Sequence, residues 1–450
     1  MSEQQGKGRR SFLIGAGGVA AAAGAWLIGD RLGAGTGAEA QEALSPEAIR
    51  KAALSKYKTL GKTGLKISKV GIGTASTTSP AVLDRAIDLG MNYVDTAHMY
   101  GNGESEKAVG KVMKARRKEV VLTTKFSPRA RTKAELTRSL DESLTRLQCD
   151  HVDCVLVHAV EEVDRIDNAE VFEVFEAARK AGKVSHLGFS GHGPKLQEVL
   201  ERGIALGRYE LVLIKFSFMD YPRLAPLLDK MHEKGIGVTA MKTRDGARHV
   251  DLEKFQRGDG FVGATLRWAS THPRVASAVL TMKTFDDADL FSKIAGQELA
   301  ARDVEMLEQY AALNDKVQCR WCGDCGPACP SEVKVWDVDR AAMYYGRYGE
   351  ERRGMELYAS MGNPAQACVG CSAPCESACA YQIPIRAQMI EADGVLGWRP
   401  PDLPIDPATA PPNEGIVRGG DGGEGEGAEG GMADRGGRRA PFPWSGVLKG

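Results

Sequence analysis

Between residues 57 and 295, short apolar runs rich in Val and Ile alternate with amphipathic stretches. The runs are short and nearly continuous in apolar residues, as strands buried on both faces are. The stretches between them have the 3.6-residue period of a helix, for example "AELTRSLDESLTRL" and "AEVFEVFEAARKAG". The pattern predicts eight strands: "KVGIGTA", "NYVDTA", "EVVLTTK", "HVDCVLVH", "VSHLGFS", "ELVLIKFS", "GIGVTAMK" and "VASAVLTM".

Strand–helix alternation predicts parallel strands joined by right-handed crossovers. Eight such units in this length are typical of an α/β fold of the (β/α)8 TIM-barrel type, which we assign to residues 57–300. An open doubly wound sheet is the alternative. A long helix, "ARDVEMLEQYAALNDK", leads into a second, mainly helical domain over residues 301–395, and the Pro- and Gly-rich residues 400–450 are expected to be a disordered tail.

The first 40 residues have the three parts of a signal peptide. Arg9 and Arg10 precede an apolar stretch from Phe12 to Ile28, and small residues then lead to a cleavage site after Ala40. "GRRSFLI" resembles the twin-arginine signal, whose translocase exports folded proteins. We therefore expect export by the Tat translocase to the periplasm or the outer face of the cytoplasmic membrane. An uncleaved membrane anchor is the alternative.

Composition narrows the choice of partners. Lys plus Arg and Asp plus Glu are both 59 in a chain of 450 residues, and no long basic block lies beyond the amino terminus. Nothing therefore indicates nucleic-acid binding. Two of the ten cysteines, Cys149 and Cys154, lie in or beside an apolar run and are interpreted as small buried hydrophobic residues.

Polar residues at the predicted strand ends form a candidate active site, because barrel enzymes place their chemistry at the carboxyl ends of the strands. Asp95, Lys125 and His158 each end a strand, and Tyr100 follows in the loop after Asp95. Carbonyl reduction needs a proton donor, and an ammonium beside a tyrosine favours its phenolate. Lys125, held by Asp95, could tune Tyr100 in this way, while His158 could orient the carbonyl oxygen.

At these residues the chain resembles the aldo-keto reductase family, through "NYVDTAHMYGNGESEKAVG", "VVLTTK" and "DCVLVH". The resemblance implies a catalytic tetrad of Asp95, Tyr100, Lys125 and His158. It also implies an oxidoreductase that passes hydride between NADP(H) or NAD(H), lying extended across the rim, and a small carbonyl or alcohol substrate.

The resemblance also implies residues that hold the nucleotide. Ser190 matches the serine that binds the nicotinamide carboxamide, and Phe216 stands where a tyrosine stacks on the nicotinamide ring. Lys242 and Arg244 could meet phosphates, and Lys283 is the cation available for a 2′-phosphate. The Asn and Gln that usually complete this site are absent, so the nucleotide half of the rim matches less well than the tetrad.

Eight cysteines fall in two close groups, which indicates metal binding. The first has the spacing C-x2-C-x2-C-x3-C-P of bacterial [4Fe–4S] ferredoxins, and the second is C-x2-C-x3-C-x3-C. We predict two [4Fe–4S] clusters; zinc or disulfides are the alternatives. A barrel followed by paired motifs and "QIPIR" resembles an aldo-keto reductase subgroup with a carboxyl-terminal ferredoxin-like domain. The predicted ligands are Cys319, Cys322, Cys325 and Cys329, then Cys368, Cys371, Cys375 and Cys379.

These features lead to one principal hypothesis and two alternatives. The principal hypothesis is an exported iron–sulfur oxidoreductase that couples electron transfer through the clusters to hydride and carbonyl chemistry, with a redox protein as a further partner. The first alternative is an electron-transfer or docking protein whose barrel no longer binds nucleotide. The second is a secreted binding module held by disulfides. A twin-arginine route suits the principal hypothesis, because clusters assembled in the cytoplasm must cross with the folded protein.

Overall fold

The structure is a computed structural model that describes residues 56–75, 79–244, 259–362 and 364–397. The predicted signal peptide and the Gly-rich tail lie outside the described residues. The strands are β1 (Tyr57–Thr59), β2 (Lys66–Ser68), β3 (Val70–Gly73), β4 (Tyr93–Asp95), β5 (Val121–Lys125), β6 (Val152–Val157), β7 (Val184–Gly191), β8 (Leu211–Lys215), β9 (Gly237–Met241) and β10 (Ser277–Thr281).

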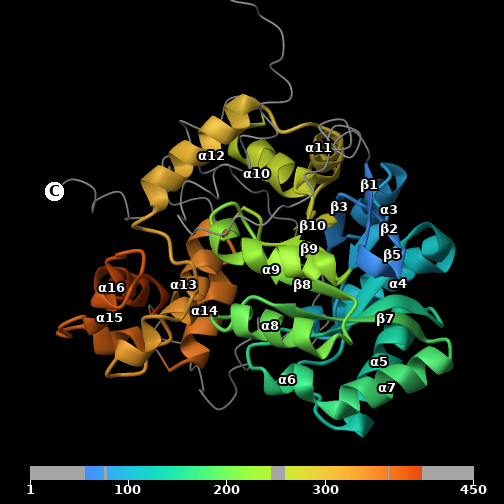
Figure 1. The fold of residues 1–450 in the computed structure, drawn as a ribbon, viewed down its shortest axis with the longest axis horizontal. Helices are drawn as coiled ribbons and strands as arrows, with labels where there is room; N and C mark the ends of the chain where they lie inside the picture. Colours follow the sequence, from blue (N-terminus) through green and yellow to red (C-terminus); the bar gives the residue numbers. More distant parts are fainter. Residues whose placement is uncertain (1–55, 76–78, 245–258, 363, 398–450) are drawn as a thin grey trace, which may run out of the picture.

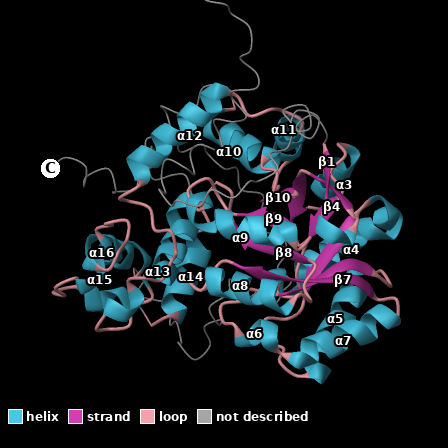
Figure 2. Cartoon of the chain, viewed as in Figure 1, coloured by secondary structure: helices cyan, strands magenta, loops and turns pink. Residues whose placement is uncertain are grey.

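Strands β3 to β10 form a closed barrel in the order β10-β3-β4-β5-β6-β7-β8-β9, and neighbouring strands are parallel. Each of the eight predicted strands contains one of these strands. The predicted eight-stranded α/β barrel is therefore confirmed, and the open sheet is excluded because β10 pairs with both β9 and β3. Figures 1 and 2 show helices surrounding these strands.

Alternating side chains along the strands separate the barrel interior from an outer core beneath the helices. The interior cluster contains Tyr93, Cys154 and Leu213. The antiparallel hairpin β1–β2, which the hydrophobic pattern did not predict, contributes the fully buried Leu60 and Ile67 to the same cluster. Cys154 is buried there and Cys149 packs partly buried against the outer core, as predicted for both.

The barrel helices follow the predicted period. Helix α5 begins in a capping box, in which Thr132 and Glu135 each accept a hydrogen bond from the other's backbone N–H. Gly182 follows α7 with a left-handed φ of 74°, as the end of the predicted helix requires. The helices associated with the barrel are α3 (Pro80–Asp88), α4 (Glu104–Arg116), α5 (Lys133–Leu147), α6 (Asp164–Asp167), α7 (Ala169–Lys180), α8 (Leu196–Leu206), α9 (Tyr221–Glu233), α10 (Gly260–Thr271), α11 (Phe285–Ala295) and α12 (Ala301–Asn314).

The described part of the carboxyl-terminal region, from residue 315 onward, contains helices and no strand. Its own apolar core includes Trp321, Val338, Tyr358 and Met389. This core explains why the segment between the cysteine groups is rich in aromatic residues and Met. The elements are α13 (Val335–Ala342), a π-helical turn η6 (Met343–Arg347), α14 (Glu351–Ser360), α15 (Pro374–Ser377) and α16 (Ile385–Leu396).

Within the described ranges, no helix is both long and apolar enough to cross a membrane.

Candidate active site at the carboxyl end of the barrel

Asp95 and Lys125 form a buried ion pair at the ends of neighbouring strands. Lys125 Nζ lies 2.6 Å from Asp95 Oδ1 and also donates to the carbonyl oxygen of Thr96 at 2.8 Å. Burial is the largest influence on both groups: it raises the pKa of Asp95 and lowers the pKa of Lys125, while their mutual attraction opposes both shifts. The parallel pairing of β4 with β5 thus positions Lys125 beside the barrel mouth.

Tyr100 lies next to this pair. The ammonium of Lys125 is 4.8 Å from the centroid of the Tyr100 ring. Tyr100 begins a tight turn in which Gly101, Asn102 and Gly103 all have left-handed φ values. At Gly103 a Cβ would come within 2.8 Å of the Arg146 guanidinium carbon, so this turn requires glycine.

His158 completes the group. Its ring centroid is 5.5 Å from that of Tyr100 with an edge-to-face angle of 80°. Its Nδ1 is buried without a hydrogen-bond partner among the described residues. Burial, followed by the charge of Lys125, lowers the pKa of His158 well below its ordinary value, so its imidazole is neutral at neutral pH. The structure therefore brings together all four residues that the sequence proposed for the tetrad.

The predicted nucleotide residues do not converge in the same way. Ser190 is the last residue but one of β7, and its Oγ accepts a hydrogen bond from the N–H of Ala159 at 2.9 Å, so it supports the turn after His158. Lys242 follows β9 in a left-handed conformation with φ of 57°. Arg244 is partly exposed at the edge of the described residues. Lys283 is paired with Glu350 of the carboxyl-terminal region at 3.4 Å.

The prediction that Phe216 stacks on a nicotinamide is wrong for this structure. Phe216 is 0% exposed, and its ring lies 5.2 Å from that of Trp268, in the outer core. The cause is strand alternation: the preceding Lys215 points to the barrel mouth, so Phe216 points outward. Lys215 Nζ is held by Asp220 Oδ1 at 2.7 Å.

We compared this site with known proteins. Residues 60–247, which include the tetrad, match the aldo/keto reductase family. The match covers less than half of the chain, so the likeness to this family holds for that stretch of the barrel. The match ends before Lys283 and before both cysteine groups. It therefore includes the four candidate catalytic residues and leaves the carboxyl-terminal region unassigned.

Individual relatives agree with this assignment. The uncharacterized oxidoreductase YqkF of Bacillus subtilis is 36% identical over 114 residues, covering 22% of this chain and 37% of that protein. The uncharacterized oxidoreductase YrpG of the same organism is 27% identical over 291 residues, covering 51% and 88%. A solved aldo-keto reductase from Klebsiella pneumoniae, in complex with NADPH, has a TM-score of 0.48 and 23% identity, covering 58% and 95%. The family match and the two Bacillus subtilis oxidoreductases support an oxidoreductase enzyme.

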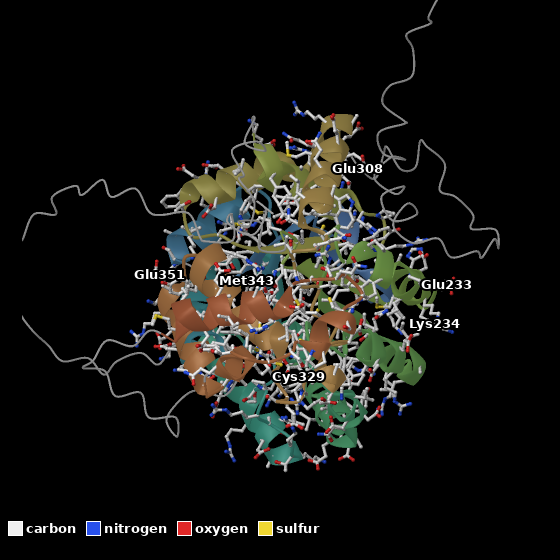
Figure 3. The ribbon with its side chains drawn as sticks, turned by 90° about the vertical axis from the view of Figure 1, so that its left-hand side faces the viewer. Glu233, Lys234, Glu308, Cys329, Met343 and Glu351 are labelled. Atoms are coloured by element: carbon white, nitrogen blue, oxygen red, sulfur yellow. The ribbon has the colours of Figure 1, made fainter. Side chains whose placement is uncertain are left out.

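The mouth of this barrel is covered by the carboxyl-terminal region. The ring of Trp321 lies 5.3 Å from Lys215 Nζ, 5.4 Å from Lys242 Nζ and 6.4 Å from the His192 ring. Gly323, with φ of 80°, lies against Pro194, where a Cβ would come within 2.6 Å of the proline side chain. Figure 3 views the molecule from the side of the carboxyl-terminal helices, with Cys329 and Met343 labelled.

Ion pairs add to this cover. Arg340 Nη1 lies 3.6 Å from Glu161 Oε1, and Lys283 Nζ lies 3.4 Å from Glu350 Oε1. Four of the five residues predicted to hold a dinucleotide are therefore engaged elsewhere: Lys242 and Lys283 contact the carboxyl-terminal region, Phe216 packs in the outer core and Ser190 supports the backbone, whereas Arg244 is partly exposed. The described rim does not fit a dinucleotide bound in that manner.

Several of these residues were missed by the sequence analysis. Lys215 ends an apolar strand exactly as Lys125 does, so the rule that selected Lys125 would also have selected it. His192 lies two residues after Ser190, in "GFSGHG". Trp321 and Glu350 have no such local signal, because only the folded chain brings them to the barrel.

The two cysteine groups lie in the carboxyl-terminal region, and none of the ten cysteines forms a disulfide. Backbone N–H groups point at three of the sulfurs: Trp321 to Cys319 at 3.4 Å, Val333 to Cys329 at 3.3 Å and Ala373 to Cys371 at 3.4 Å. Hydrogen bonds to sulfur are one of the means by which proteins tune thiolate ligands of iron–sulfur clusters.

The fourth cysteine of each group lies near cysteines of the other group. Cys329 lines one small pocket together with Cys368, Cys371 and Cys375. Burial, with the neighbouring Cys329, raises the pKa of Cys368 to about 11. Burial, followed by the neighbouring Cys322, Cys375 and Cys379, raises the pKa of Cys325 to about 12, so two cysteines of the second group lie near this member of the first.

Within the described residues, no three His, Cys, Asp or Glu side chains are arranged to hold a metal ion. Zinc, the alternative considered for these cysteines, would take four ligands around one ion, and it stays an alternative. A [4Fe–4S] cluster has four irons that take separate thiolates, so its ligands stand further apart. The donor set of four thiols around one pocket fits this second kind of group.

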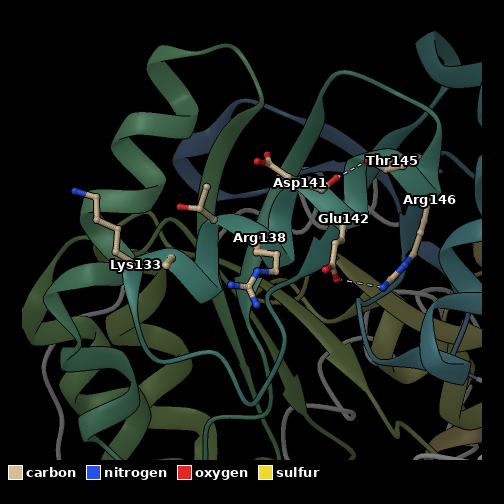
Figure 4. A pocket seen from close by; sticks show the side chains of 8 residues that line it. Lys133, Arg138, Asp141, Glu142, Thr145 and Arg146 are labelled. Carbon is tan, nitrogen blue, oxygen red and sulfur yellow. Dashed lines mark hydrogen bonds and ion pairs between the residues drawn. The ribbon is translucent and has the colours of Figure 1, made fainter.

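A separate surface groove plays no part in this arrangement. It runs along the outer face of α5 between Lys133 and Arg146 (Figure 4). None of the predicted catalytic, nucleotide or cysteine residues lines it. We therefore place the candidate active site at the barrel mouth.

Proposed function

We propose that the chain is an oxidoreductase that interconverts a carbonyl and an alcohol at Tyr100, and that its electrons pass through [4Fe–4S] clusters bound by the two cysteine groups. The observation that carries the proposal is the tetrad: Lys125 and Asp95 in a 2.6 Å ion pair, with Tyr100 and His158 beside them. A scaffold would have no need to keep a buried lysine under a tyrosine ring, because burying both charges costs free energy.

The tetrad residues have separate roles in this reaction. Reduction takes two electrons, which an external redox protein would supply one at a time through the clusters, and two protons. Tyr100 donates its hydroxyl proton to the carbonyl oxygen and water supplies the proton that the carbon takes; oxidation of the alcohol runs in reverse, with Tyr100 accepting the hydroxyl proton. The Lys125 ammonium stabilises the phenolate form of Tyr100, and Asp95 holds that ammonium in place. The neutral His158 donates a hydrogen bond that orients the substrate oxygen.

Two groups of thiols support the cluster part of the proposal. Cys319, Cys322 and Cys325 with Cys379 would hold one cluster, and Cys368, Cys371 and Cys375 with Cys329 would hold the other. The exchange of fourth ligands follows the sequence pattern of two-cluster ferredoxins. Bound clusters would each carry one electron between an external redox protein and the barrel.

A nucleotide-dependent reductase is the second candidate, favoured by the family match over residues 60–247. In it, NADP(H) or NAD(H) would be held tightly from assembly onward. The Lys283–Glu350 pair, the buried Phe216 and the position of Trp321 favour the cluster-dependent form.

We also propose that the chain is exported by the twin-arginine route to the periplasm or the outer face of the cytoplasmic membrane. The support is the sequence "GRRSFLI" and the need to export a cluster-containing protein in its folded state. Cell fractionation tests this: replacing Arg9 and Arg10 with lysine should retain the full-length protein in the cytoplasm, and unchanged export would contradict it.

Anaerobic purification tests the main proposal. Absorbance and electron paramagnetic resonance spectra should reveal [4Fe–4S] clusters, and chromatography after acid release should detect no nucleotide. Stoichiometric nucleotide would favour the second candidate. An iron-free, colourless protein that still contains nucleotide would contradict the cluster-dependent form.

A further inference from the structure

Arg146, near the end of α5, lies behind the turn that carries Tyr100. Its Nη1 donates to the carbonyl oxygen of His98 at 3.2 Å. On the other side of the turn it packs against Gly103, where a Cβ would come within 2.8 Å of the guanidinium carbon. Since Tyr100 begins the turn that ends at Gly103, one guanidinium holds the chain both before and after this tyrosine.

Two carboxylates hold this guanidinium in turn. Arg146 Nη1 lies 3.3 Å from Glu106 Oε2, and Arg146 Nη2 lies 3.3 Å from Glu142 Oε2, a pair drawn in Figure 4. Glu142 Oε2 also lies 2.8 Å from His98 Nε2, so it fixes the side chain of the residue whose carbonyl group Arg146 binds. These contacts form one connected group beside the turn.

The same group reaches the strand that ends at Lys125. Glu106 is fully buried, and its Oε1 accepts a hydrogen bond at 2.6 Å from Oγ1 of Thr124, the residue before Lys125 in β5. The backbone N–H of His98 donates to the carbonyl oxygen of Lys125 at 3.4 Å. The guanidinium is therefore linked to the strand end as well as to the turn.

An arginine suits these contacts. A buried carboxylate without a cation costs free energy, and the charge of Arg146 compensates that of Glu106. An arginine presents five N–H donors in a rigid plane, so it can serve Glu106, Glu142 and the His98 carbonyl group together. A lysine would keep the charge but offers its three donors from one point.

Arg116, the last residue of α4, provides a matched comparison. Its side chain is 17% exposed, against 23% for that of Arg146. Its guanidinium also binds carboxylates, namely Asp84, Asp88 and Glu119. None of these belongs to the tetrad or to its turn. The two arginines are therefore similar in exposure and pairing and differ in the part of the barrel that they hold.

We propose that Arg146 is a positioning residue for the reaction, because it holds the turn that carries Tyr100 beside Lys125. The inference rests on the proposed function, in which Tyr100 transfers a proton, and extends it to a residue outside the tetrad. Proton transfer depends on the placement of the donor, and a displacement of about 1 Å can cost about 10²-fold in rate. Loss of Arg146 should therefore lower turnover and leave substrate affinity nearly unchanged.

Kinetics of the full chain test this proposal, with reduced methyl viologen as electron donor and a carbonyl compound as substrate. Arg146→Met should lower kcat by about 10²-fold with KM within about threefold of wild type. Arg146→Lys should recover part of the loss, since it returns the charge to Glu106. Arg116→Met is the matched control and should keep the wild-type kcat. If Arg146→Met does not fold, the double variant with Glu106→Gln avoids the unpaired carboxylate and should show the same loss.

Two further readouts distinguish positioning from a general effect on stability. In hydrogen exchange, Arg146→Met should speed the exchange of backbone amides in residues 98–103, whereas Arg116→Met should not. In a Tyr100→Phe background, Arg146→Met should lower kcat no further, because the arginine acts through the tyrosine.

The outcomes separate this inference from the proposed function. Wild-type kcat in Arg146→Met, while Tyr100→Phe still lowers turnover, would overturn the inference alone. An equal loss of kcat with and without the Tyr100 hydroxyl would also overturn it, because Arg146 would then act elsewhere in the fold. Wild-type turnover in Tyr100→Phe would contradict the proposed function itself, and the inference with it.

Discussion

The two halves of the barrel mouth are built differently. On the tetrad side, the charged residues find their partners within the barrel, as Lys125 does with Asp95. On the opposite side, Lys242 contacts Trp321 and Lys283 pairs with Glu350, both from the carboxyl-terminal region. The barrel alone can thus assemble the proton-transfer half, whereas the second half exists only when the two regions pack together.

This difference bears on the proposal that clusters, and not a nucleotide, supply electrons to this barrel. The strand ends that position the tetrad are fixed by barrel closure, so Asp95 and Lys125 keep their relation whatever lies above them. The opposite loops lie under Trp321, which sits between two predicted cluster ligands, Cys319 and Cys322. A region inserted at that edge covers the surface a nucleotide would use without disturbing the acid–base group.

The largest expected effect concerns Tyr100, on the tetrad side of the barrel mouth. Tyr100→Phe should reduce turnover by about 10²- to 10⁴-fold, the usual contribution of a positioned proton donor. The measurement is reduction of a panel of carbonyl compounds with reduced methyl viologen as electron donor. Tyr57→Phe is the control, because Tyr57 is 39% exposed and lies on the β1–β2 hairpin. Equal turnover in both variants would mean that Tyr100 takes no part in the reaction and that the barrel serves only as a scaffold.

The next largest effect concerns the ion pair on the tetrad side. Lys125→Met leaves Asp95 buried without its counter-ion, and we expect a loss of ~3–5 kcal/mol in the free energy of unfolding. Urea titration measures this. The double variant Asp95→Asn with Lys125→Met should recover much of the stability but none of the activity.

Lys195→Met provides the control, because Lys195 is an exposed cation that pairs with Glu162 at 2.6 Å, and exposed ion pairs contribute within about 1 kcal/mol. A similarly small loss in Lys125→Met would mean that the pair is not buried in solution, and the contrast between the two halves would disappear.

The sequence predicts the tetrad side of the barrel mouth better than the side that the carboxyl-terminal region covers. The eight strands and the tetrad were predicted because each strand is a local apolar run and each tetrad residue lies at or just after a strand end. Phe216 was misassigned because a single-residue change of register reverses which side chain faces the mouth. The partners of Lys242 and Lys283 could not be predicted, because Trp321 and Glu350 are far along the chain and meet the barrel only through tertiary packing.

The cysteine groups also show what can and cannot be predicted from local sequence. Their spacing predicts thiolate ligands, since four cysteines within eleven residues are a local signal, and this stays a prediction. The grouping of Cys329 with Cys368, Cys371 and Cys375 around one pocket is not a local property and needed the fold. Local motifs thus indicate the kind of chemistry, while the arrangement of ligands depends on packing.

The smallest expected effect concerns Tyr344, on the side of the barrel mouth that the carboxyl-terminal region covers. Its pKa is about 8 in the folded protein, against about 10 in an unfolded chain. Between these values the unfolded state binds more protons, so Tyr344 contributes stability that is present above pH 10 and is lost as the pH falls through about 8. Relative to Tyr344→Phe, wild-type protein should gain up to about 2–3 kcal/mol of unfolding free energy between about pH 7 and pH 10.

Two measurements check this: urea titrations across the pH range, and the ultraviolet absorbance of phenolate, which should include a transition near pH 8 that Tyr344→Phe lacks. Because Lys242 and Arg353 produce the shift, the transition should move upward in Lys242→Met. A Tyr344 that titrates near its ordinary value in wild-type protein would mean that these cations do not converge, and the covered half of the mouth would then be a surface contact with no shared electrostatic site.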